Sequence, residues 1–181
     1  MPKSRGRKPD KRSKKAYRSP AGRTPTAGIT GADNAEYAET LDDEAERRAF
    51  AMPYVDARIG DEDFRNLNPD SEDERSLLIE GEHPEYQVDP EFEGEIDGVD
   101  PRLHLAMHQI VTNQLWDNDP PEVWQAASRL RDLGMDRHDI LHAIGELNVA
   151  HLHAALTAHE LFDLERYRAE LDQLGRDEFT G

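Results

Sequence analysis

Cysteine is absent from the chain of 181 residues. A chain without thiols forms no disulfide, offers no cysteine nucleophile and has no thiolate ligand for a zinc finger. Long apolar runs are missing too, because no stretch approaches the ~18 apolar residues of a membrane span and the N-terminus lacks the apolar segment of a signal peptide. These absences predict a cytoplasmic protein without a membrane partner.

Apolar residues are scarce, and lysine is confined to the start of the chain. Hydrophobic residues make up 36% of the chain and charged residues 34%, whereas apolar residues are ~45–50% of ordinary globular chains. Only part of the chain is therefore expected to pack. No lysine follows Lys15, and residues 1–30 hold ten basic residues against the single acid Asp10, although the net charge of the chain is −17. A basic arm on an acidic body is predicted.

The basic arm, residues 1–30, is rich in Lys, Arg, Ser, Pro and Gly and has no apolar periodicity. Burial cannot offset the entropy lost on ordering such a segment, so disorder is predicted. The arm could bind the phosphates of nucleic acid or of the ribosome, or dock onto the acidic body of the same chain. The candidate phosphate-binding residues are Lys3, Arg5, Arg7, Lys8, Lys11, Arg12, Lys14 and Lys15.

The rest of the chain divides into an acidic, weakly structured segment at residues 31–69, a helical domain at 70–175 and a tail at 176–181. A short helix is expected before Pro53, and residues 61–74 are expected to be loop up to the next helix cap. The fold class predicted is all-α, a small domain of about four to five helices, with no strand pattern. Helices are expected over residues 72–82, 101–116, 120–133, 137–160 and 163–175.

The expected helices begin at recognisable caps. Asp70 or Ser71 can cap the first, and Asp100 before Pro101 is an N-cap followed by a proline at the first helical position. Asp119 before Pro120 repeats that pattern.

Two histidines, His104 and His108, lie four residues apart in the stretch PRLHLAMHQIVTNQLW. Residues at this spacing are neighbours on one helix face, and two imidazoles so placed can bind one metal ion. A helical wheel centred on Leu103 puts both rings at the edge of the apolar face. His138 and His142 repeat the spacing in a later helix, on the side opposite its apolar residues.

His83 ends an earlier helix and could fold back towards the pair, which completes the set of candidate metal ligands. The zinc-protease signature requires Glu directly after the first histidine, and here Leu105 follows His104, so that chemistry is not indicated. Zinc or iron(II) would suit imidazole ligands. The alternative is that these histidines are structural and form hydrogen bonds to the backbone or to Asn113 and Gln114.

Four motifs in this order, HPEY, PRLHLAMHQIVTNQLW, DPPEVW and DRHDILHAIGEL, resemble the uncharacterised bacterial family catalogued as domain of unknown function 1841, in the form of its actinobacterial members. The resemblance spans roughly residues 70–160. It implies that His83, His104 and His108 form one constellation, but it implies no activity. Gln109 stands where close relatives carry Glu, and His142 stands where other branches carry an acidic residue.

Three functions follow from these observations. The protein is a small metal-binding helical protein, a nucleic-acid- or ribosome-associated accessory protein attached through its basic arm, or an acidic protein-interaction module with structural histidines. The spacing of residues 123–147 also resembles a helix-turn-helix, but the second helix has no surplus of positive charge, so groove reading is not expected. No general base or nucleophile identifies an enzyme.

Overall fold

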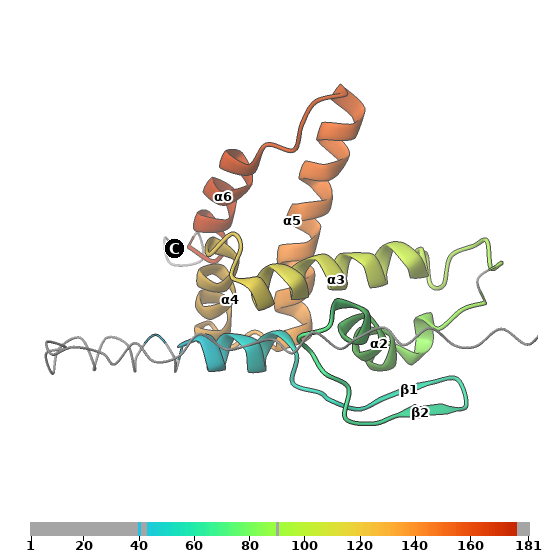
Figure 1. Ribbon diagram of the computed structural model, residues 1–181. Helices are drawn as coiled ribbons and strands as arrows, with labels where there is room; N and C mark the ends of the chain where they lie inside the picture. Colours follow the sequence, from blue (N-terminus) through green and yellow to red (C-terminus); the bar gives the residue numbers. More distant parts are fainter. Residues whose placement is uncertain (1–39, 41–42, 90, 177–181) are drawn as a thin grey trace, which may run out of the picture.

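Helices dominate the computed structural model, which describes residues 40, 43–89 and 91–176 (Figure 1). The prediction of an all-α domain is confirmed, with one small β-hairpin in addition. The basic arm at residues 1–30 lies outside the described residues. Within the part that the structure describes, no helix is long and apolar enough to cross a membrane.

The helices begin with a segment at residues 43–51. The later helices are α2 (Glu72–Glu82), the 3-10 helix η1 (Pro84–Tyr86), α3 (Pro101–Asp117), α4 (Glu122–Asp132), α5 (Arg137–Ala158) and α6 (Leu164–Gln173).

Side-chain caps begin most of these helices where the sequence predicts them. Ser71 accepts a hydrogen bond from the backbone N–H of Glu74 at the start of α2. Asp100 accepts from two backbone N–H groups of the first turn of α3, and Asp136 does the same for one such group in α5. These caps satisfy N–H groups that have no partner within the helix, which is why they mark the helix starts so reliably.

The start of α4 differs from the prediction. The helix begins at Glu122, with Pro121 as its N-cap and no side-chain hydrogen bond at the cap, so Asp119 is not the cap. The Glu122 carboxylate accepts hydrogen bonds from Arg168 of α6. A tertiary ion pair therefore engages the first side chain of α4, and no side-chain hydrogen bond caps the helix.

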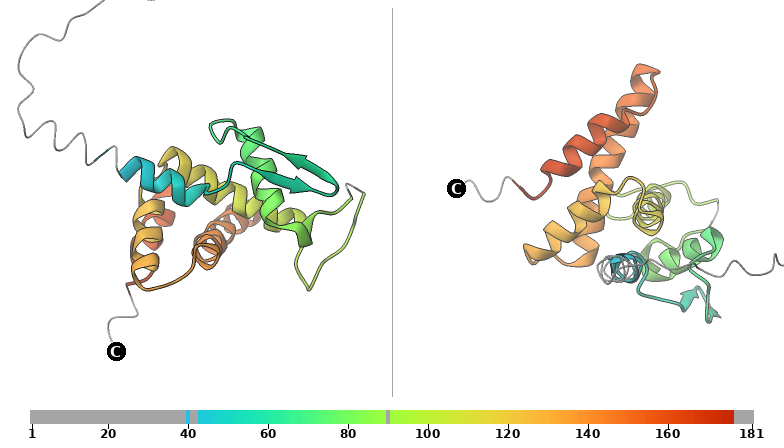
Figure 2. Two further views of the ribbon diagram at one scale, coloured as in Figure 1. Left: turned by 90° about the horizontal axis from the view of Figure 1, so that it is seen from below. Right: turned by 60° about the vertical axis from the view of Figure 1, so that its left-hand side comes forward.

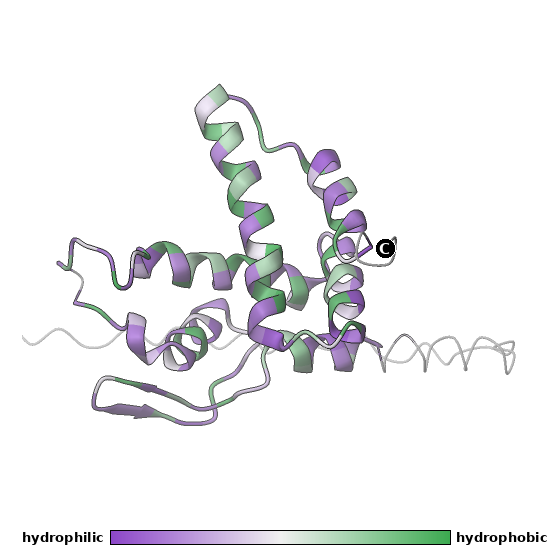
Figure 3. Ribbon diagram, turned by 180° about the vertical axis from the view of Figure 1, so that it is seen from behind, coloured by the Kyte–Doolittle hydropathy of each residue, from purple (hydrophilic) through white to green (hydrophobic). Residues whose placement is uncertain are grey.

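The hairpin joins β1 (Ala57–Ile59) and β2 (Glu62–Phe64) in antiparallel register. The sequence predicts loop here and no strand, which is wrong for these residues. Three-residue strands are too short to show an alternating pattern, and this hairpin is mainly hydrophilic (Figure 3). It is held by packing against α2, where a Cβ atom at Gly81 would lie 2.7 Å from the Cβ of Ala57, so only glycine permits this approach.

The core forms where α3 crosses α5, with α4 and α6 packed on one side of the crossing and α2 below α3 (Figure 1). At the crossing, a Cβ atom on Gly145 would overlap the side chain of Met107, so the absence of a side chain lets the two helices approach closely. Fully buried side chains from four helices fill the core: Val111, Leu115, Val123, Ala127, Ile140, Ile144, Tyr167 and Leu171. The close crossing is what brings the amino-terminal turns of α3 and α5 together.

The helical segment at residues 43–51 packs on the ends of α3 and α4 (Figure 2). The buried guanidinium of Arg47 donates hydrogen bonds to the last carbonyl groups of α3, those of Leu115 and Trp116. Ala51 and Met52 are buried in the core. The packed body therefore begins well before residue 70.

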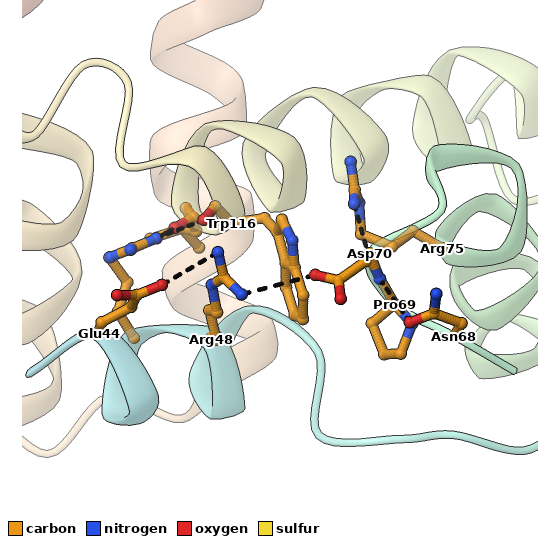
Figure 4. Close-up of polar contacts among 9 residues, drawn as sticks. Glu44, Arg48, Asn68, Pro69, Asp70, Arg75 and Trp116 are labelled. Atoms are coloured by element: carbon orange, nitrogen blue, oxygen red, sulfur yellow. Dashed lines mark hydrogen bonds and ion pairs between the residues drawn. The ribbon is translucent and has the colours of Figure 1, made fainter. Parts of the chain in front are cut away.

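Trp116 ties this segment to α2 as well. Its ring lies between two guanidinium groups, with Arg48 at 4.9 Å and Arg75 at 5.5 Å from the ring centroid. Arg48 also bonds to Glu44 and Asp70, as Figure 4 shows. Because a guanidinium over an aromatic face is held by cation–π attraction, Trp116 acts as a structural residue between the segment 43–51 and α2.

Candidate metal centre

Five histidines gather where the end of α2 meets the first turns of α3 and α5. His83 is the C-cap residue of α2, His104 and His108 lie on α3, and His138 and His142 lie on α5. The ring centroids are close: 4.3 Å from His83 to His108, 4.6 Å from His104 to His108 and 4.5 Å from His138 to His142. The structure thus brings together all five histidines that the sequence singles out.

Four of the five present nitrogen atoms to a common point. One ring nitrogen from each of His83, His104, His108 and His138 lies within 4.8 Å of the other three. Ligand nitrogens in a tetrahedral zinc site, with Zn–N bonds of about 2.0–2.1 Å, are separated by roughly 3.4 Å. The nitrogen atoms lie up to 4.8 Å apart, so binding a metal ion would require the rings to draw together.

The ring of His83 is oriented by the helix that it terminates. Its Nδ1 lies 2.7 Å from the carbonyl oxygen of Ile79, and because a carbonyl can only accept, Nδ1 carries the proton. The Nε2 atom therefore has a free lone pair. Backbone carbonyls fix the tautomer of metal-binding histidines in this way, by bonding to the nitrogen that does not face the metal.

Three buried nitrogen atoms of the cluster have no hydrogen-bond partner among the described residues: Nε2 of His83, Nε2 of His104 and Nδ1 of His108. Buried polar atoms are almost always partnered, because leaving one without a partner costs about 1–3 kcal/mol. Three such atoms in one cluster of imidazoles suit a metal ion, which would accept all three lone pairs.

The structural interpretation of these histidines is met in part. His83 bonds to the backbone carbonyl of Ile79, as that interpretation expects. Asn113, however, bonds to Arg75 and Glu72, and Gln114 accepts a hydrogen bond from Tyr167, so the described hydrogen bonds of these two amides go to other helices and not to His104 or His108.

The helical wheel of α3 is right about Met107, Val111 and Leu115, which are buried, but it puts the centre of the buried face at the wrong residue. Leu103, the predicted centre of the apolar face, is 54% exposed, whereas His104 is 6% and His108 is 1% exposed. Hydrophobicity alone assigns leucine to the core, but the packing of α2 and α5 on α3 rotates the histidines inward. His138 and His142 do lie apart from the apolar face of α5, and they meet the other histidines there.

Burial makes the central histidines weak bases. Burial is the largest cause, and the neighbouring histidines add to it. Together they lower the pKa of His108 to about 2 and that of His104 to about 4. Burial, and then His138, also lowers the pKa of His142. At neutral pH these rings are uncharged, which is the form that binds a metal ion.

The metal-free protein is expected to lose stability as the pH falls from about 6.5 to about 4. The folded-state pKa of His104 lies below its unfolded value, so the unfolded chain binds more protons in this window and folding becomes less favourable. Urea unfolding in EDTA at several pH values measures this slope. A His104→Gln variant, which has no imidazole at this position, should show a shallower slope; an equal slope would contradict the assignment to His104.

His142 stands at the edge of the cluster. Its Nε2 lies 3.2 Å from Nε2 of His108, and between two neutral rings only one nitrogen can donate. His142 is not one of the four converging histidines, yet it is close enough to serve as a further ligand or to bond to one.

An apolar groove beside the cluster is the feature that the sequence did not reveal. It is lined by His104 and His142 together with residues of α3, α5 and the connector before α3, and no sequence pattern connects those segments. Tyr86 also joins the site, with its ring 4.2 Å from that of His104. Gln109 bonds to Ser76 of α2 instead, so the position at which the resemblance predicts Glu in close relatives lies outside the cluster.

Comparison with known proteins identifies one family. Its model, described as a domain of unknown function (DUF1841), matches residues 70–173, the part of the chain that runs from the start of α2 to the end of α6. No curated protein and no solved structure matches the chain. All five clustered histidines lie within the matched residues, whereas the helical segment 43–51 and the hairpin lie before them.

Proposed function

The chain belongs to the DUF1841 family, and we propose that it is a metal-binding protein whose centre is built by His83, His104, His108 and His138. The observation that carries this proposal is the convergence of four imidazole nitrogens within 4.8 Å of one another. Three of these rings are buried and hold nitrogen atoms without a hydrogen-bond partner. The particular likeness to actinobacterial members, and a cytoplasmic location, stay predictions of the sequence.

The ligand set narrows the choice of metal. Four imidazoles without a carboxylate suit zinc, iron(II) and their neighbours among the transition metals and do not suit calcium or magnesium, which prefer oxygen ligands. Neutral imidazoles leave the full charge of a divalent ion uncompensated. The centre would therefore act as a Lewis acid towards a group that reaches it.

Metal analysis of the untagged, full-length protein tests the proposal. We expect about one equivalent of zinc or iron, and a lower melting temperature after EDTA treatment. Metal at a thousandfold excess over Kd stabilises the folded state by about 4 kcal/mol, which corresponds to roughly 10 °C for a domain of this size. No stoichiometric metal, together with no change on adding zinc or iron(II) to the EDTA-treated protein, would refute the proposal.

No contact among the described residues supports either of the other two functions. Binding of nucleic acid or of the ribosome depends on the basic arm at residues 1–30, which lies outside the described residues, and stays a prediction of the sequence. The acidic interaction module also stays a prediction.

A further inference from the structure

A groove runs between α3 and α5 directly beside the histidine cluster. Its volume is about 580 Å³, within the range of about 300–1,000 Å³ that is typical of small-molecule sites. Its walls are mostly apolar: Leu103 and Met107 come from α3, and Val149 and Ala150 come from α5. The groove is therefore large enough and apolar enough to hold a small organic molecule.

The groove opens onto the proposed metal centre. His104 and His142 belong both to the histidine cluster and to the groove lining, so a molecule in the groove would have one end next to the metal. His83 lies at the end of α2, does not line the groove, and has its ring fixed by Ile79. Because four imidazoles already complete a tetrahedral site, a ligand from the groove would bind next to His142 by raising the coordination number of the metal or by displacing one imidazole.

The charges along the groove define the head group of the ligand. A divalent ion on four neutral imidazoles attracts an anionic oxygen donor. Glu146 also lines the groove, one turn after His142 on α5. A carboxylate in this place accepts a hydrogen bond, so the head group should carry an N–H or O–H beside its metal-binding oxygens.

We propose that the groove binds a small molecule with an aliphatic body and an oxygen-chelating head group, the head on the metal and the body between α3 and α5. This inference rests on the proposed metal centre. Met107 suits the role of an adaptable wall, because its unbranched thioether side chain can adjust to the shape of an aliphatic chain. Leu103, which is 54% exposed, would be covered by the bound molecule.

Two hydroxamic acids that share a head group test the proposal. Acetohydroxamate and octanohydroxamate both offer two chelating oxygens and one N–H, and they differ only in the aliphatic chain. With the full-length, cobalt(II)-loaded protein, binding is read from the visible spectrum of the metal and from calorimetry. We expect the longer acid to bind at least about tenfold tighter, because the added methylene groups leave water for the groove.

A matched pair of variants locates the binding of the chain. Val149→Asp places a charge in the groove wall and should reduce the preference for the longer acid to less than about threefold. Leu156→Asp makes the same type of change on the same helix, at a position that is 67% exposed and outside the groove lining, and should keep the full preference. Ala150→Phe, at an exposed groove position, narrows the groove and replaces Val149→Asp if that variant does not fold.

The two proposals fail in different ways. Absence of bound metal refutes the metal centre, and with it the inference. A metal-loaded protein that binds both acids equally, or that keeps its chain-length preference in Val149→Asp and Ala150→Phe alike, leaves the metal centre in place and overturns the groove as the site of the aliphatic body.

Discussion

Alanine at any of the four converging histidines is expected to lower the affinity for zinc by at least about a hundredfold, because loss of a ligand costs more than loss of an outer-shell partner, which costs 10–100-fold. The four variants are His83→Ala, His104→Ala, His108→Ala and His138→Ala. Competition with a chromophoric chelator measures the affinity of each. His153→Ala is the matched control, since His153 lines the groove but is not one of the converging ligands.

His142→Ala should give an intermediate loss, below that of the four ligands. Its Nε2 contacts that of His108, but the ring is half-buried and is not one of the four that converge. A loss at His142 that equals the others would make it a full ligand. Equal affinity in all variants would show that the cluster does not bind the metal.

The stability of a His108 variant distinguishes a functional role of the histidines from a structural one. His108 is 1% exposed, and its Nδ1 has no hydrogen-bond partner among the described residues. In the metal-free state, His108→Leu is expected to match or exceed the stability of the natural sequence, because an apolar side chain removes the cost of about 1–3 kcal/mol for an unpartnered buried nitrogen. A functional site commonly carries such a cost.

Urea unfolding in EDTA checks this expectation. A structural histidine predicts the opposite result, a clear destabilisation of His108→Leu. The metal-loaded proteins should invert the order, since the natural sequence binds the ion more tightly and gains more stability from it.

A fragment that begins at residue 70, where the family match begins, is expected to lose its cooperative unfolding transition. Residues before this point supply Ala51 and Met52 to the core and Arg47 to the end of α3. Loss of hydrogen bonds from a charged donor costs about 1.5–3 kcal/mol, and exposure of Met52 adds about 1.5–3 kcal/mol. The total of about 3–6 kcal/mol is enough to unfold a domain at the lower end of the usual stability range of about 5–15 kcal/mol.

Thermal unfolding followed by circular dichroism measures the effect. The control fragment begins at residue 40 and should melt like the full chain. In the full chain, Arg47→Ala should destabilise by about 2–3 kcal/mol, and Arg48→Ala, whose side chain is 40% exposed, by less than about 1 kcal/mol. A fragment from residue 70 that melts like the control would show that residues 43–69 add nothing to the fold.

Local sequence determined most of the helices. Ser71, Asp100 and Asp136 each bond to backbone N–H groups within the next turn, and such contacts need no other part of the chain. The exception is α4, where Glu122 bonds to Arg168, distant in sequence. The hairpin was not predicted for a similar reason, because it is held by the contact of Ala57 with α2.

The candidate site was only half contained in the sequence. Spacing named two pairs, His104 with His108 and His138 with His142, because residues four apart on a helix share a face whatever surrounds them. His83 was added from its place at a helix end, and the family resemblance implied that it joins His104 and His108. The buried face of α3 was judged from hydrophobicity, which put Leu103 inward, and the packing of α2 and α5 decided otherwise. Whether His83 would meet the pair on α3 depends on how α2 packs on α3, and whether His138 would do so depends on the crossing of α3 and α5 at Gly145. Only the tertiary structure determines these contacts.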